Sequence, residues 1–168
     1  MKSWLIEKYG LENLQLVEQA VPVPGPKQIV IHNRAASLNY RDWDLLSGHY
    51  LGPHTLPLVP ASDVAGEVVR VGSEVSDFIA GDRVTGLFRQ HWLDGEPDEK
   101  AFASSLGGPL QGVLSEYVLL EEKGAPVRPN GSGNRGSLIG HGFRPLERAQ
   151  RLTDRLQRGY TTRCERSL

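Results

Sequence analysis

The sequence contains almost no cysteine and no long apolar run. Its single cysteine, Cys164, excludes an internal disulfide and a cysteine-rich zinc site in this chain. No stretch approaches the roughly 18 apolar residues that a membrane-spanning helix needs, so we expect no membrane partner. The N-terminus has no apolar segment of the kind found in secretory signals. Together these absences predict a cytoplasmic protein in a reducing environment.

The residues that are present suit one globular domain but are unevenly charged. The chain has 168 residues, of which 39% are hydrophobic and 23% are charged. Ten of its 19 Lys and Arg residues and 17 of its 20 Asp and Glu residues lie in residues 1–127. The other nine basic residues, all arginine, and three acidic residues lie in residues 128–168. We therefore predict a domain over residues 1–127 followed by a disordered Arg- and Gly-rich tail over 128–168.

Short β-branched or mixed apolar runs, separated by Gly and Pro, predict a mainly β fold for the first part of the chain. The predicted strands lie at residues 3–9, 14–21, 28–32, 64–71, 83–88 and 113–120. Residues 39–47 predict a short helix with Asn39 at the N-cap, Asp42 in a capping box and Gly48 as the stop. A second short helix is predicted within residues 99–106. This pattern is typical of a β-barrel or sandwich.

A G-x-G-x-x-G match at residues 131–136 resembles a dinucleotide-binding loop, but its context is wrong for one. In such loops a strand delivers the glycines and a helix follows them. Here the preceding stretch A-P-V-R-P-N contains two prolines, which exclude a buried strand, and Gly140, Gly142 and Pro145 interrupt a following helix. We interpret the glycines as a linker.

The polar residues offer no convincing metal site. The five histidines are scattered, and only His49 and His54 could approach each other, across a loop. A zinc site needs three or four converging ligands, so we predict no metal. Asp63, directly before an apolar strand, has no paired carboxylate nearby. We interpret it as a structural group that accepts hydrogen bonds from the backbone of a turn.

Several motifs in order resemble one enzyme superfamily. They are A-S-L-N-Y-R-D at residues 36–42, L-P-L-V-P-A-S-D-V-A-G-E-V-V-R-V-G at 56–72, F-I-A-G-D-R-V at 78–84 and L-S-E-Y-V-L-L at 114–120. This series resembles the GroES-like N-terminal catalytic domain of the medium-chain dehydrogenase/reductase superfamily, over residues 1–127. The resemblance implies a GroES-like β-barrel with short helices.

Two departures indicate the branch of the superfamily. Its zinc alcohol dehydrogenases carry a metal-binding Cys where this chain has Asn39, and His-Glu where it has Ser62 and Asp63. The chain instead resembles the zinc-independent quinone oxidoreductases and enoyl-reductase-like enzymes. This resemblance implies that no metal is bound, and it agrees with a structural role for Asp63.

The resemblance also implies a chemistry and two site residues. In this branch NADPH delivers hydride to a small quinone or to the activated C=C bond of an enone. Asn39 would bind the nicotinamide end of the cofactor, and Tyr50 would be the catalytic hydrogen-bond donor to a substrate oxygen. Some members have another tyrosine where this chain has Asp44. Two alternatives stay open: Asn39 as a plain helix cap, and Tyr50 as a loop residue packed on the barrel.

The superfamily places a Rossmann domain after the last strand of the barrel, and we find none in this chain. We therefore expect the chain alone to bind no NADPH tightly and to be inactive. One hypothesis for residues 128–168 is a shift of reading frame near residues 127–130. The alternative function is a non-catalytic GroES-like remnant or interaction module. No nucleic-acid partner is expected.

Overall fold

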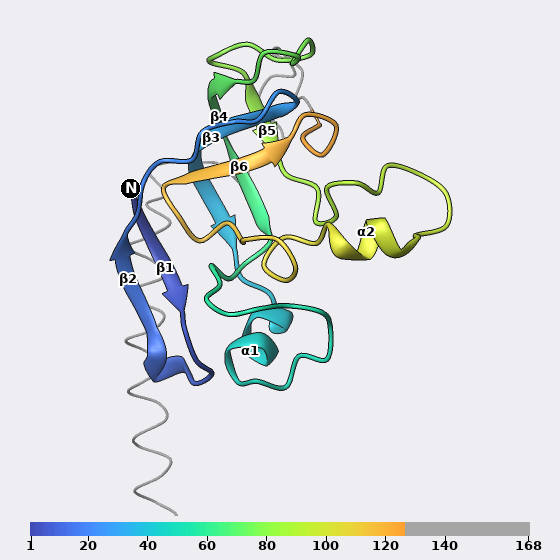
Figure 1. Cartoon of the computed structure of the whole chain (residues 1–168). Helices are drawn as coiled ribbons and strands as arrows, with labels where there is room; N and C mark the ends of the chain where they lie inside the picture. Colours follow the sequence, from blue (N-terminus) through green and yellow to red (C-terminus); the bar gives the residue numbers. More distant parts are fainter. Residues whose placement is uncertain (127–168) are drawn as a thin grey trace, which may run out of the picture.

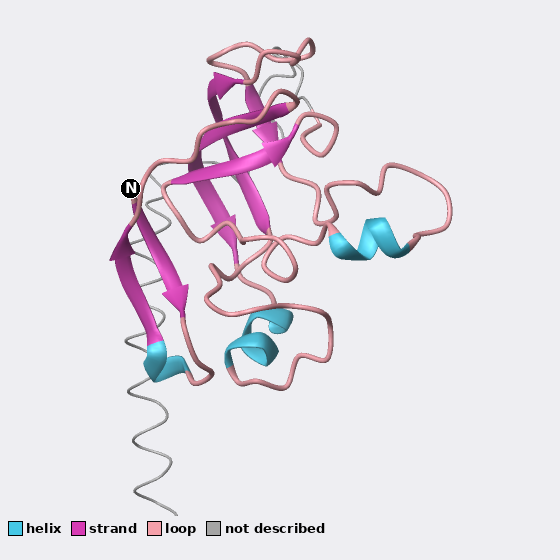
Figure 2. Cartoon of the chain, viewed as in Figure 1, coloured by secondary structure: helices cyan, strands magenta, loops and turns pink. Residues whose placement is uncertain are grey.

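The computed structural model describes residues 1–126, and Figure 1 shows their path. The predictions for the tail and for the glycine motif at residues 131–136 lie outside these described residues. The elements follow one another as β1 (Lys2–Ile6), a 3-10 turn (Leu11–Asn13), β2 (Leu14–Glu18), β3 (Gln28–Ser37), α1 (Tyr40–Leu46), β4 (Asp63–Val71), β5 (Arg83–Thr85), α2 (Glu99–Ala103) and β6 (Tyr117–Glu121). The described part is thus mainly β with short helices, as predicted (Figure 2).

The strands form two antiparallel sheets. A four-stranded sheet has the order β5-β4-β3-β6, and β1 pairs with β2 in a separate hairpin. The long strand β3 is central: it pairs with β4 on one side and with β6 on the other. Two register shifts interrupt its pairing with β4. Such bulges bend a strand and increase its twist, which favours a curved sheet over a flat one.

The N-terminal hairpin is joined to the large sheet through the segment before β6. The backbone N–H of Trp4 donates to the carbonyl of Leu114 at 2.9 Å, and that of Glu116 donates to the carbonyl of Lys2 at 3.0 Å. The buried side chain of Asn33, on β3, donates to the carbonyls of Val113 and Ser115 at 2.7 and 3.0 Å. These bonds connect both β1 and β3 to the segment before β6 and so hold the hairpin against the large sheet.

Two apolar clusters stabilise this arrangement. The larger one lies inside the barrel and consists of buried residues from β1, β3, β4, β5, β6 and the loops between them, among them Ile29, Ile31, Val68, Val84 and Leu120. The smaller one lies between β1 and α1 and consists of Ile6, Leu45, Leu46 and Leu58. Because Leu45 and Leu46 lie in the last turn of α1, this second cluster fixes the helix against the barrel, with α1 below the sheet in Figure 1.

The structure confirms the existence and type of each predicted element in residues 1–126. The helix predicted for residues 39–47 is α1, and Gly48 follows it with a φ of 76°, a left-handed conformation that glycine adopts without strain. Strand β3 extends to Ser37, five residues beyond the predicted end at His32. Strand β6 begins at Tyr117 and not at Val113, because residues 113–115 bond instead to β1, β3 and the turn before β4.

Candidate functional site

The start of α1 is built around the side chain of Asn39. Its backbone N–H donates to the carboxylate of Asp42 at 2.8 Å, which forms the predicted capping box. Its side-chain Nδ2 donates to the carboxylate of Asp63, at the first position of β4, at 3.0 Å. The same oxygen of Asp63 accepts a hydrogen bond from the Ser37 hydroxyl at 3.0 Å. Asp63 thus holds the exposed Asn39 amide in one orientation between α1 and the sheet.

Asp63 therefore has a different set of partners from the one expected. We expected its carboxylate to accept from backbone N–H groups of a turn, and within residues 1–126 its hydrogen-bond donors are the side chains of Ser37 and Asn39. An exposed carboxylate in this place also gives the site a negative charge. That charge disfavours a phosphate group beside Asn39 and is compatible with an uncharged amide.

Asp42 is the buried acid of the site. Only 4% of its surface is exposed, and its Oδ1 atom is buried without a hydrogen-bond partner in the described part of the chain. Burial raises the pKa of the Asp42 carboxyl above its ordinary value of 3.8, although the hydrogen bond from Asn39 and the charge of Arg41 oppose this shift. The nearest guanidinium nitrogen of Arg41 lies 4.0 Å from Oδ1, so the ion pair between them is weak.

Tyr50 follows α1 in a loop that packs against the smaller apolar cluster. Its backbone N–H donates to the carbonyl of Asp44 at 3.1 Å, so the end of the helix positions the loop. Its half-buried ring contacts the cluster of Ile6, Leu45, Leu46 and Leu58. A Cβ at Gly52 would lie 2.5 Å from the outer atoms of the ring. The Tyr50 ring therefore lies directly over the backbone of Gly52, and a larger residue there would displace it.

Arg41 joins the helix to Tyr50 and to a second aromatic ring. Its guanidinium carbon lies 4.5 Å from the centroid of the Tyr50 ring and 5.0 Å from that of Phe88, both within the range of cation–π contacts. One of its nitrogens donates to the carbonyl of Leu106 at 3.3 Å. Because Arg41 is in the first turn of α1 and contacts the Tyr50 ring, it links the two ends of the site.

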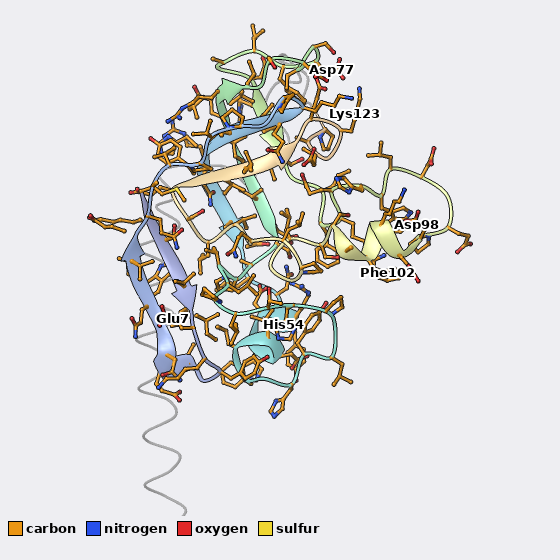
Figure 3. The ribbon with its side chains drawn as sticks, viewed as in Figure 1. Glu7, His54, Asp77, Asp98, Phe102 and Lys123 are labelled. Carbon is orange, nitrogen blue, oxygen red and sulfur yellow. The ribbon has the colours of Figure 1, made fainter. Side chains whose placement is uncertain are left out.

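The loop that carries Tyr50 is also bound to the turn after β1. The hydroxyl of Tyr9 and Nε2 of His54 lie 2.9 Å apart, and Nδ1 of His54 lies 2.8 Å from the carbonyl oxygen of Gly52. Figure 3 shows His54 beside α1. A neutral His54 that donates from Nδ1 accepts from Tyr9, so this histidine has two structural partners. Within residues 1–126, His54 forms no hydrogen bond with His49, although the sequence had allowed these two histidines to approach each other.

No metal centre or membrane span emerges from the part of the chain that the structure describes. Within residues 1–126 no three His, Cys, Asp or Glu side chains lie where they could hold a metal ion together. None of the helices found there has the length and apolar character needed to cross a membrane. The expectation of a zinc-free protein remains a prediction.

The structure places both predicted site residues beside α1, Asn39 at its start and Tyr50 after its end. No hydrogen bond joins the two side chains within the described residues, and their functional roles remain proposals. Sequence reasoning missed Arg41 and Phe88. Arg41 and Phe88 are far apart in the sequence, so no local pattern of residues predicts that they are in contact. The sequence signal that was available was the charge of Arg41 inside a predicted short helix.

Comparison with known proteins identifies the fold and its relatives. Residues 25–129 match the model of the alcohol dehydrogenase GroES-like domain family. A zinc-type alcohol dehydrogenase-like protein of Schizosaccharomyces pombe is 40% identical, and the match covers 66% of this chain and 32% of that protein. A chloroplastic NADPH-dependent alkenal/one oxidoreductase of Arabidopsis thaliana is 38% identical, over 77% of this chain and 31% of that protein.

The solved structures agree with this relationship. A quinone oxidoreductase of Pseudomonas syringae has a TM-score of 0.59 and 28% identity, over 79% of this chain and 34% of that one. The chain thus spans about a third of the length of these relatives. Since one relative is chloroplastic, cytoplasmic localisation stays a prediction.

Proposed function

Because the chain belongs to the alcohol dehydrogenase GroES-like domain family, we propose that it is the substrate-side catalytic domain of a zinc-independent, NADPH-dependent oxidoreductase that reduces quinones or activated C=C bonds. The names of two relatives support this substrate class: one is a quinone oxidoreductase, and the other acts on alkenals or alkenones with NADPH. The whole reaction would also need a cofactor domain, which residues 1–126 do not include.

The observation that carries the proposal is the pair of polar groups on either side of α1. The amide of Asn39 is exposed and held in orientation by Asp63, so its oxygen and nitrogen can face a second amide. The Tyr50 ring is fixed by Gly52 and by the guanidinium of Arg41. Tyr50 would donate to the substrate oxygen, where negative charge increases during reduction.

The described residues fit only one end of NADPH. The nicotinamide carboxamide has a donor and an acceptor, which Asn39 could complement. The pyrophosphate normally lies at a helix N-terminus behind a glycine-rich turn, and Asp63 makes the start of α1 unfavourable for a phosphate. When bound, NADPH supplies the hydride. The residues of this chain orient the nicotinamide and bind the oxygen of the substrate.

A chimaera tests the proposal. Residues 1–126 would be joined to the cofactor domain of the Pseudomonas syringae quinone oxidoreductase, and oxidation of NADPH by an ortho-quinone and by an alkenone would be followed. We expect turnover with at least one of them. Tyr50→Phe should lower kcat by about 10²-fold, the effect typical of losing one such donor. Asn39→Ala should raise the KM for NADPH.

The matched control is Tyr40→Phe, which removes the hydroxyl of a tyrosine on α1 that is 78% exposed. This variant should keep the parent activity. A folded chimaera that binds NADPH but reduces neither substrate would contradict the proposal and favour a non-catalytic module. A Tyr50→Phe chimaera with unchanged kcat would remove Tyr50 from the chemistry and leave the domain assignment intact.

A further inference from the structure

A cavity lies beside the long loop between β5 and α2, which the proposed function does not use. It has a volume of about 380 Å³, within the range of small-molecule sites. Seven residues line it, all from this one loop: Leu87, Phe88, Arg89, Trp92, Leu93, Asp94 and Gly95. Most of these side chains are apolar, and only Arg89 and Asp94 carry charge. The cavity therefore combines an apolar wall with one positive and one negative group.

Arg89 is held among three aromatic rings. Its guanidinium carbon lies 4.0 Å from the ring centroid of Phe102, 5.3 Å from that of Trp92 and 5.7 Å from that of Phe88. Among residues 1–126 no hydrogen bond or ion pair engages this guanidinium, and its Nε is buried without a partner. An arginine in this state is oriented by stacking, while its two terminal nitrogens keep their hydrogen-bond donors for a ligand.

The cavity wall is anchored from behind by the buried side chain of Gln90. Its Nε2 donates to the carbonyls of Leu87 and Gly124, at 2.6 and 3.1 Å, and its Oε1 accepts from the backbone N–H of Glu121 at 2.9 Å. The Trp92 indole N–H donates to the carbonyl of Gly95 at 3.0 Å. These bonds fix both ends of the lining segment. The loop is thus preorganised, which lowers the entropy cost of binding a ligand.

Exposed apolar surface continues outward from the cavity. Trp92 is 40% exposed, Leu93 58% and Phe102, which Figure 3 labels on α2, 45%. A flat apolar molecule could cover these side chains and bring an acidic group to Arg89. The planar guanidinium offers two parallel donors that match the two oxygens of a carboxylate.

We propose that this cavity binds a small molecule that has a flat apolar body and one carboxylate, with the carboxylate on Arg89 and the body against Phe88, Trp92 and Leu93. The site does not depend on the proposed reduction, because it needs neither NADPH nor Tyr50. Phe88 adjoins both sites, since its ring also contacts Arg41. Asp94 opposes the carboxylate electrostatically, and it forms no ion pair with Arg89 that would neutralise either charge.

The test is a titration of the intact chain, without NADPH, with trans-cinnamate and with its neutral analogue cinnamamide. Chemical shifts of the backbone amides report where each molecule binds. We expect both to shift the signals of residues 87–95, and cinnamate to bind at least tenfold more tightly. Arg89→Gln should abolish this preference while leaving weak binding of both molecules. Asp94→Asn should increase the affinity for cinnamate severalfold and leave that for cinnamamide unchanged.

Arg34→Gln is the matched control, because Arg34 is exposed and its ion pair with Glu67 lies on the sheet, away from this loop. It should retain the preference for cinnamate. Equal binding of the two molecules by the parent chain, or shifts centred outside residues 87–95, would overturn the proposal. If Arg89→Gln fails to fold, the Asp94→Asn titration decides alone: an unchanged affinity for cinnamate would also overturn it. Neither result bears on the chimaera, so the two proposals fail separately.

Discussion

At the scale of single residues, polar side chains determine the geometry around α1. Asp42 caps the helix through the backbone of Asn39, and Asp63 fixes the side chain of the same residue. Arg41 lies between the Tyr50 and Phe88 rings. Of these side chains Asp42 is buried, so its carboxylate has lost its hydration, and a small chemical change there should have a measurable consequence.

The first prediction concerns Asp42 and pH. Burial raises the pKa of Asp42 in the folded state. Protonated Asp42 therefore stabilises the fold at pH values below 3.8, its ordinary pKa. This stabilisation is lost as the pH rises through the pKa of Asp42 in the folded protein. Asp42→Asn does not titrate. The free energy of unfolding of the parent, relative to this variant, should therefore fall as the pH rises from 3.8 through the raised pKa of folded Asp42.

Urea unfolding at a series of pH values measures this difference. Asp44→Asn, on the same helix, provides the control for a general change of charge. If the difference between parent and Asp42→Asn increased with pH, the carboxylate would be stabilised in the folded state, and burial would not be the dominant influence on it.

At the scale of elements, strands were easier to predict than their ends and partners. The runs Q-I-V-I-H and V-A-G-E-V-V-R-V are rich in β-branched residues and proved to be the first half of β3 and all but the first residue of β4. The extension of β3 to Ser37 through N-R-A-A-S has no such signal, since it results from pairing with β4. The start of β6 was misplaced because residues 113–115 make tertiary hydrogen bonds that no local pattern encodes.

The sites, too, have a part that the sequence predicts and a part that it does not. The capping box of α1 was predictable because Asn39, Asp42 and Gly48 occupy fixed local positions. The cavity at residues 87–95 was not, since it depends on the path of an irregular loop, and the ring nearest to Arg89, that of Phe102, comes from α2. Local chemistry can be read from spacing, whereas contacts between distant segments depend on the closed barrel.

The second prediction concerns the loop between β4 and β5. The buried carboxylate of Glu122, which follows β6, accepts hydrogen bonds from the backbone N–H groups of Ser76 and Asp77 at 2.7 and 2.9 Å. Glu122→Ala leaves both donors without this partner and should lower the free energy of unfolding by about 2–4 kcal/mol. Glu122→Gln keeps an acceptor oxygen and should cost about 1 kcal/mol.

Thermal and urea unfolding would measure both variants. Lys123→Ala is the neighbouring control, because its ion pair with Asp77 is exposed and should contribute little. If Glu122→Ala were as stable as the parent, water would replace the carboxylate without loss and the carboxylate would not hold the loop.

At the scale of the whole molecule, the described part forms a closed unit. Its two apolar clusters are made by residues between Trp4 and Ala125, and its first strand bonds to the segment before its last one. This organisation supports two predictions about the chain beyond the barrel and about its cofactor.

The third prediction is that removal of residues 131–168 changes the melting temperature by less than about 2 °C. The buried residues of both clusters in the described part lie between Trp4 and Ala125, and the sequence of the tail has little apolar patterning. Calorimetry of the shortened and full chains makes the comparison. A fall of several degrees would show that the tail contributes to the stability of the barrel.

The fourth prediction is that the chain alone binds NADPH with a dissociation constant of about 1 mM or weaker. Asn39 and Tyr50 offer a few hydrogen bonds of about 0.5–1.5 kcal/mol each, which do not offset an association cost of at least about 4 kcal/mol. Isothermal titration measures this directly. A micromolar dissociation constant would contradict this prediction and would favour a dinucleotide-binding role for the glycines at residues 131–136.

The bond between Trp4 and Leu114 has a consequence for synthesis of the protein. The ribosome makes the first strand long before the segment that it pairs with, so β1 and β2 wait as an isolated hairpin, which is at best marginally stable in water. At about 5–20 residues per second, this interval lasts roughly 5–20 s. During that time the apolar side of β1, including Trp4 and Ile6, has no final partner. Nascent chains stalled before residue 114 should therefore bind chaperones, and chains released past β6 should not.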